Sequence, residues 1–216
     1  MQINVLLNSS KKLLSEPFKK SKKPLDEQQF IVQLKEGNSA AYNHLIEQFS
    51  DKVFNTIISI LQNQEDAEDV TQEVFIAVFN SIKEFKSESK LATWIYRIAV
   101  SKALEFLRNK KRKKRFGIIQ NLFGMERILP ETDNLHFYHP GVKLENKELS
   151  AILFKAINQL AETQKTAFVL SKIEELSYVE IAEIMNTSVS SVESLLFRAK
   201  QNLQKILADY YQKNHR

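Results

Sequence analysis

Apolar residues recur every three or four positions through the first half of this chain, which is the spacing of an amphipathic α-helix. Residues 25–107 contain a single glycine, Gly37, and no proline. Gly37 is a natural helix stop because glycine adopts the left-handed conformation at little cost. The pattern predicts four helices: about 26–36, about 39–62, one from near Glu65, and one from near Ala92 into a basic run.

The pattern fades over residues 117–144. This segment holds three of the four glycines and two of the four prolines of the chain. A segment of this length without strong periodicity is too long for an ordinary connection inside one compact domain. We therefore expect a flexible linker between two domains.

Helical spacing returns over residues 145–216, which contain no glycine or proline, and predicts helices at about 145–159, 163–174, 178–185 and 189–212. Capping boxes, in which Ser and Glu three residues apart satisfy first-turn amides, are expected at Ser177–Glu180 and Ser190–Glu193. Two such caps separated by a short turn indicate a helix-turn-helix. The residues expected to interlock its helices are Ile181, Ala182, Met185, Val189, Val192 and Leu196.

These segments predict an all-α protein with two small helical domains, residues 25–116 and 145–216, of which the second contains the helix-turn-helix. Residues 1–24 are expected to be a disordered basic extension. In the last helix of the first domain, one apolar face is expected to comprise Ile95, Ile98, Ala99, Ala103, Phe106 and Leu107.

Composition narrows the class of protein to which this chain can belong. The apolar content of 43% and charged content of 26% are ordinary for a globular protein. The absence of cysteine excludes disulfides, thiolate zinc sites and a cysteine nucleophile. No segment has the roughly 18 apolar residues that a membrane span needs, so we expect a cytoplasmic protein without membrane insertion.

Charge is distributed unevenly. Residues 1–24 carry a net charge of +5, residues 25–107 a net charge of −6, and residues 108–116 add +7. A basic run beside an acidic domain suggests that different surfaces bind different partners. The basic run is a candidate for phosphate contacts, although the solvated end of a helix would have the same composition.

Catalysis is not indicated: the four histidines are scattered, and neither a phosphate-binding glycine loop nor a nucleophile elbow occurs. We expect no catalytic residue, metal or cofactor. Carboxylates cluster on the helix around Asp66 without the ligand spacing of a calcium loop, so they form either a solvated face or a docking face. Trp94, next to a polar loop, is either a core anchor or a ring on which bases of single-stranded DNA stack.

At this point the residues resemble a known family, the extracytoplasmic-function (ECF) sigma factors. The motif DAEDVTQEVF at residues 66–75, Phe85, and TWIYRIA at residues 93–99 are similar to region 2 of that family. The motif LSYVEIAEIM at residues 176–185 is similar to region 4, as are the positions that follow it: Ser188, Val192, Ser194, Leu196, Arg198 and Ala199.

The resemblance implies that the chain binds core RNA polymerase and promoter DNA, and that an anti-sigma factor of unspecified identity restrains it. The residues implied to contact the clamp helices of the largest polymerase subunit are Asp66, Asp69, Gln72 and Glu73. The loop implied to capture a flipped minus-ten base comprises Lys86, Ser87, Glu88, Ser89 and Lys90. Support for that strand and the upstream duplex is expected from Trp94, Arg97, Arg108, Lys110, Lys111 and Arg112.

The second helix of the helix-turn-helix would read the minus-thirty-five element in the major groove. Its candidate contacts are Ser188, Ser190, Ser191, Glu193, Ser194, Phe197, Arg198 and Lys200. Glu193 and Leu195 stand where the family commonly has Lys and Arg, which leaves the base preference open. Two alternatives remain: a stand-alone DNA-binding regulator that does not need polymerase, and a helical interaction protein without a nucleic-acid role.

Overall fold

The computed structural model describes residues 27–122 and 147–214, and every regular element in these two ranges is helical. The expected all-α fold is confirmed. The predicted extension 1–24 and the predicted linker residues 123–144 lie outside the described residues. The helices are α2 (Glu27–Lys35), α3 (Ser39–Leu61), α4 (Gln64–Ser81), η1 (Ile82–Glu84, a 3₁₀ turn), α5 (Leu91–Leu122), α6 (Lys147–Asn158), α7 (Glu162–Lys172), α8 (Tyr178–Ile184) and α9 (Val189–Asn214).

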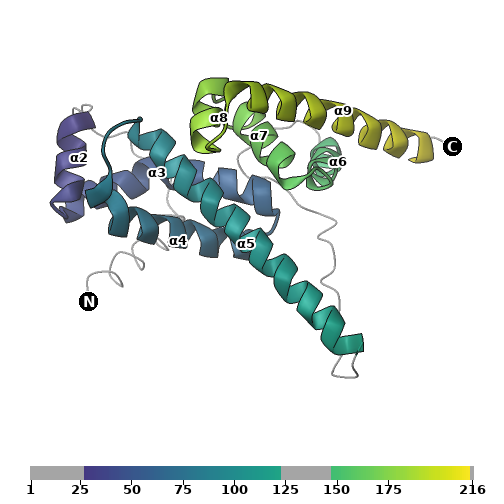
Figure 1. Ribbon diagram of the computed structural model, residues 1–216, viewed down its shortest axis with the longest axis horizontal. Coiled ribbons are helices and arrows are strands. Elements are labelled where there is room, and N and C mark those ends of the chain that lie inside the picture. The colour runs from purple at the N-terminus through teal and green to yellow at the C-terminus, as the bar shows by residue number, and fades with distance from the viewer. Residues whose placement is uncertain (1–26, 123–146, 215–216) are drawn as a thin grey trace.

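The first unit is a bundle of α3, α4 and α5, with α2 and η1 packed at one end (Figure 1). Its core follows the predicted periodicity: Leu45, Ile57, Val74 and Ile95 are fully buried. Fully burying such a side chain contributes about 1.5–3 kcal/mol to folding, so this apolar stripe fixes the bundle.

Capping and turn residues mark the ends of these helices at the positions that the sequence predicts. Gly37 has φ +77, and its N–H donates to the carbonyl of Leu34 at 3.0 Å. The Asn38 side chain then accepts from the amides of Ala40 and Ala41, which caps α3. Gln62 closes α3 in the left-handed region at φ 54, without the help of a glycine.

Helix α5 is longer than predicted. Its 32 residues run from Leu91 to Leu122, so the first six residues of the expected linker are helical. Gly117 does not end the helix because one glycine inside a helix costs only about 1 kcal/mol relative to alanine. The C-terminal half of α5 extends beyond the rest of the first unit (Figure 1).

The second unit comprises α6 to α9, with α8 and α9 forming the helix-turn-helix (Figure 1). The capping box at Ser177 and Glu180 is present. The predicted box at Ser190 is wrong in position: the Ser188 hydroxyl accepts from the amide of Ser191 at 3.1 Å, so α9 begins at Val189. Val189 is consequently an exposed first-turn residue rather than part of the helix crossing.

The two units share an apolar cluster, although the sequence predicted separate domains. In this cluster, Tyr96, Val100 and Ala103 of α5 meet Leu170 of α7 and Ile181 of α8. All five are at most 6% exposed. The contact between the units is therefore as dry as the interior of either unit. Within the described ranges, no helix is long and apolar enough to cross a membrane.

The capping residue of α9 gives a first prediction. We expect Ser188→Ala to lower the free energy of unfolding by about 1 kcal/mol, because the substitution removes the side chain that caps the helix. Ser190→Ala should change it by well under half of that, because Ser190 caps no amide. Urea unfolding of both variants checks this. A larger loss of unfolding free energy for Ser190→Ala than for Ser188→Ala would instead identify Ser190 as the capping residue, as the sequence predicts.

Candidate functional site

The acidic face of α4 lies against lysines of α5. Lys110 Nζ is 2.9 Å from Asp66 Oδ2, and Lys102 Nζ is 3.5 Å from Glu73 Oε2. Asp69, between the two pairs in sequence, is exposed, and no ion pair to it occurs in the described part of the chain. The structure thus brings the four predicted polymerase contacts together on one helix, with two of their carboxylates already partnered.

Pairing of this kind contributes little to stability because each pair is partly solvated. Its effect is on binding: the face keeps one carboxylate, Asp69, without an ion-pair partner among the described residues. About two turns farther along the same side of α4, the apolar side chain of Ile76 is exposed. Gln72 is half-buried beside it. A basic partner with a small apolar contact matches this combination.

The polar loop 86–90 joins η1 to α5. Lys86, Ser87 and Glu88 are exposed, and Ser87 adopts φ 59. The loop is anchored where α5 begins, because the amide of Leu91 donates to Glu27 Oε1 at 3.2 Å. Lys86, Ser87 and Glu88 are therefore exposed on a loop that is held in place at the start of α5.

Three predicted strand contacts in and after this loop are engaged within the chain. Lys90 Nζ lies 3.1 Å from Glu180 Oε1 of α8, and Arg97 Nε donates to the main-chain oxygen of Glu183 at 3.1 Å. The half-buried Trp94 packs on Phe85, with ring centroids 5.0 Å apart. Trp94 therefore packs against the core of the first unit while part of its surface stays exposed.

The basic run, residues 108–116, lies on the C-terminal half of α5 and includes Lys110, which pairs with Asp66 of α4. Lys111 Nζ is 2.6 Å from Glu162 Oε1, at the start of α7. An open groove of about 450 Å³ lies here, and its lining residues are Glu105, Arg108, Asn109, Lys111, Arg112, Arg115 and Glu162. Four of these side chains carry positive charge, which suits a phosphate backbone.

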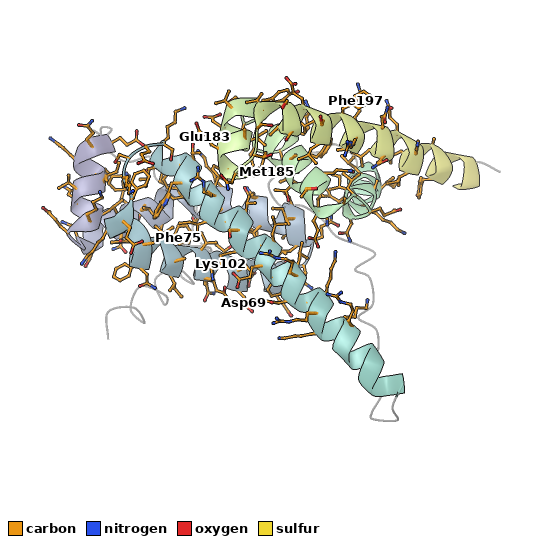
Figure 2. All side chains as sticks on the ribbon, in the orientation of Figure 1. Asp69, Phe75, Lys102, Glu183, Met185 and Phe197 are labelled. Atoms are coloured by element: carbon orange, nitrogen blue, oxygen red, sulfur yellow. The ribbon has the colours of Figure 1, made fainter. Side chains whose placement is uncertain are left out.

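The candidate DNA-reading face of α9 is open. Glu193, Ser194, Arg198 and Lys200 are exposed. Phe197 is 62% exposed and projects away from the body of the molecule (Figure 2). The remaining candidates lie at the helix start, where Ser188 and Ser190 are exposed and Ser191 is half-buried. Asp69 and Phe197 lie on opposite sides of the molecule in Figure 2, so the two predicted binding faces do not overlap.

Sequence reasoning missed the polar groups between the units. The Tyr96 hydroxyl donates to Glu174 Oε2 at 2.8 Å, and burial, followed by the charge of Glu174, raises the pKa of Tyr96. Burial also raises the pKa of Glu174. Gln62 Nε2 donates to the carbonyl of Phe154 at 2.8 Å. No motif marks these residues, because each acts through a neighbour far away in the sequence.

Lys165 is the most deeply buried lysine of the contact between the units, with 5% exposure. Its ammonium donates to Asn158 Oδ1 at 2.7 Å and to the carbonyl of Ile60 in α3 at 3.3 Å. Burial lowers the pKa of Lys165 from 10.5 to about 8; Glu162 opposes this shift and Lys111 adds to it.

Both halves of the chain are similar to known proteins. The sequence models described as Sigma-70 region 2 and Sigma-70 region 4 match residues 45–113 and 150–203. The chain is 33% identical to the ECF RNA polymerase sigma-E factor of Haemophilus influenzae, over 83% of the chain and 94% of that protein. It is 30% identical to the ECF RNA polymerase sigma factor SigW of Bacillus subtilis, over 83% and 95%.

Two solved structures share the fold. One is CnrH in complex with the cytosolic domain of CnrY, with a TM-score of 0.59, 19% identity, and coverage of 85% of this chain and 97% of that one. The other is the sigma factor RpoE in complex with the anti-sigma factor NepR from Bartonella quintana, with a TM-score of 0.57, 20% identity, and coverage of 77% and 96%.

The lowered pKa of Lys165 gives a second prediction. Between about pH 8 and pH 10.5 the unfolded chain holds a proton on this lysine that the folded chain has released, so folding stability gains with rising pH in that window. Lys165→Met lacks this gain. Urea unfolding at several pH values should show wild type becoming more stable relative to the variant above pH 8. A difference that does not vary with pH would contradict the shift.

Proposed function

The chain belongs to the ECF family of RNA polymerase sigma factors, and from this premise we propose how its surfaces divide the work of promoter-specific transcription initiation. A sigma factor binds core polymerase and recognises and opens promoter DNA. The alternative of a stand-alone regulator is not favoured, because a region 2 match precedes the helix-turn-helix in the same chain. We assign region 2 to residues 25–116 and region 4 to residues 145–216.

Polymerase binding is assigned to the face of α4 that carries Asp66, Asp69, Gln72 and Glu73. The single observation that supports this assignment best is the exposed carboxylate of Asp69, set between two carboxylates that α5 neutralises. An exposed charge steers a basic partner and fixes its register. The exposed apolar side chain of Ile76, two turns farther along α4, supplies area that the docked partner can bury.

Minus-ten recognition is assigned to the loop 86–90, with Trp94, Arg97 and the basic run of α5 behind it. Exposing a base costs a few kcal/mol of pairing and stacking, which a protein pocket can return once the base is captured. Opening then draws on binding free energy, so we propose no catalytic step and no cofactor. The site of action is the cytoplasm, where polymerase and promoter meet.

Minus-thirty-five recognition is assigned to the first turns of α9. The exposure of Arg198 and Lys200 supports this assignment, since phosphate and base contacts need free cationic side chains. Glu193, exposed on the same turns, disfavours phosphate close by and favours a cytosine amino group. The helix therefore reads its element with fewer backbone contacts than an arginine-rich start would give.

We also propose an anti-sigma partner. The likeness in fold to CnrH and RpoE, each solved in complex with another protein, supports this proposal. Such a partner would need to cover the polymerase-binding face, the DNA-binding faces, or both.

A third prediction tests the polymerase-binding face. Asp69→Lys should weaken binding to core polymerase by at least about tenfold, or about 1.4 kcal/mol, because it reverses the one carboxylate of that face that has no ion-pair partner among the described residues. The matched control is Asp51→Lys, the same charge change at an exposed position of α3. Binding of labelled protein to purified core enzyme measures both. Equal affinities for the two variants would rule out this face.

A fourth prediction tests the recognition helix. Arg198→Ala should weaken binding to a promoter fragment that the reconstituted holoenzyme transcribes by about 1–3 kcal/mol if the arginine reads a base. Lys205→Ala, at an exposed position farther along α9, is the control. Filter binding at several salt concentrations separates base contact from phosphate contact, because only loss of a phosphate contact reduces the salt slope. Unchanged affinity and slope would place Arg198 outside the interface.

A further inference from the structure

The exposed face at the start of α9 carries a carboxylate between two apolar side chains. Glu193 is exposed, and Val189 and Phe197 lie four residues before and after it, about one helical turn away on either side. Their side chains are 39% and 62% exposed, so they contribute little to the core of the second unit. Figure 2 shows Phe197 pointing away from the body of the molecule. A partner that docks on this face therefore meets the carboxylate and its two apolar neighbours together.

No neighbour on the same helix compensates the charge of Glu193. Residues three and four positions away are the neighbours of a side chain on a helix surface, and here they are Val189, Ser190, Leu196 and Phe197. None of them is cationic, and the Ser190 hydroxyl already lies 3.0 Å from Ser188 Oγ. Among the residues that the structure describes, no hydrogen bond or ion pair reaches the Glu193 carboxylate. Its hydrogen bonds must come from solvent or from a bound partner.

Docking of α9 in the major groove removes that solvent. Val189 and Phe197 displace water on both sides of Glu193 when base edges cover them. A carboxylate that loses water without gaining a donor costs free energy. In the major groove guanine and thymine present only acceptors to a polar side chain, and adenine presents the N7 acceptor next to its amino group. Cytosine alone offers an amino group without an acceptor on the same base.

We infer that Glu193 determines minus-thirty-five specificity by rejection: its carboxylate admits the base pair that offers it a cytosine amino group and penalises the other three. The inference rests on the proposed reading of this element by α9. Rejection differs from attraction in its effect on affinity, because a carboxylate also repels the phosphate backbone of every duplex. Glu193 therefore lowers affinity for DNA in general, lowers it least where the cytosine is present, and so raises selectivity.

The attraction that keeps α9 in the groove comes from other residues. Arg198 and Lys200 are exposed farther along the same helix and carry the opposite charge. Because these cations do not depend on Glu193, a change at Glu193 leaves the means of docking in place. Selectivity and affinity can therefore be measured separately.

The first experiment removes the charge and keeps the shape of the side chain. Glu193→Gln retains an acceptor oxygen and adds an amide donor, so it should tolerate the guanine and thymine that the carboxylate rejects. Reconstituted holoenzyme is mixed with a promoter fragment that it transcribes, in which the minus-thirty-five segment is randomised, and the bound fragments are sequenced. We expect wild type to enrich cytosine at one position. Glu193→Gln should reduce that enrichment at least about fivefold and bind the unselected pool severalfold more tightly.

A matched control separates base reading from net charge. Glu175→Gln makes the same charge change at an exposed position outside α9, and it should leave the enriched cytosine unchanged.

The second experiment replaces rejection of guanine with recognition of guanine. The guanidinium fork of an arginine donates to O6 and N7 of guanine, so Glu193→Arg should enrich guanine at the position where wild type enriches cytosine. A folding defect would lower binding to all fragments, but it would not exchange one base for another at a single position.

The outcomes separate this inference from the proposed function of α9. If wild type selects a minus-thirty-five sequence and Glu193→Gln selects the same one, with affinity raised equally for all fragments, the inference is overturned and reading by α9 stands. Absence of any base preference in the randomised segment for wild type would overturn reading by α9, and the inference with it. A cytosine that is lost in Glu193→Gln and becomes guanine in Glu193→Arg supports both.

Discussion

Helix α5 must bury apolar side chains in two directions, and the arrangement of both units depends on this constraint. Ile95 and Ala99 point into the bundle with α3 and α4. Tyr96, Val100 and Ala103 point the other way, into the cluster shared with α7 and α8. A helix that is apolar on two faces needs a second covering layer, and here the helix-turn-helix unit is that layer.

The same helix distributes the charge of the molecule. Its lysines at 102 and 110 lie against the acidic face of α4, and Lys111 lies against α7. Because these pairs are partly solvated, they contribute little to folding. Their importance is that they decide which charges stay exposed without a pair among the described residues: Asp69 on α4 and the arginines around the groove of α5. In a sigma factor, free charges of opposite sign on separate faces allow one chain to bind a protein and DNA at once.

The features of the fold that depend on residues close together in the sequence could be predicted from the sequence. Periodicity predicted the positions of the helices. The left-handed turn at Gly37 predicted the end of α2, and the capping box at Ser177 predicted the start of α8. The errors also have local causes. Ser188 and Ser190 are the same residue type and equally suited to cap a helix, and only the observed start of α9 at Val189 shows that Ser188 is the cap. Gly117 resembles a helix stop, but the helix continues through it because the neighbouring residues favour helix.

The sequence by itself determined the elements, the helix-turn-helix, and the residues assigned to polymerase and DNA through family resemblance. Tertiary structure alone decided which of those residues are free. Lys90 and Arg97 meet α8, Asp66 meets Lys110, and Lys165 meets the end of α3, all across long stretches of chain. Periodicity shows that a face is apolar or charged, but it does not show what covers that face, because the covering residues are chosen by packing between distant segments.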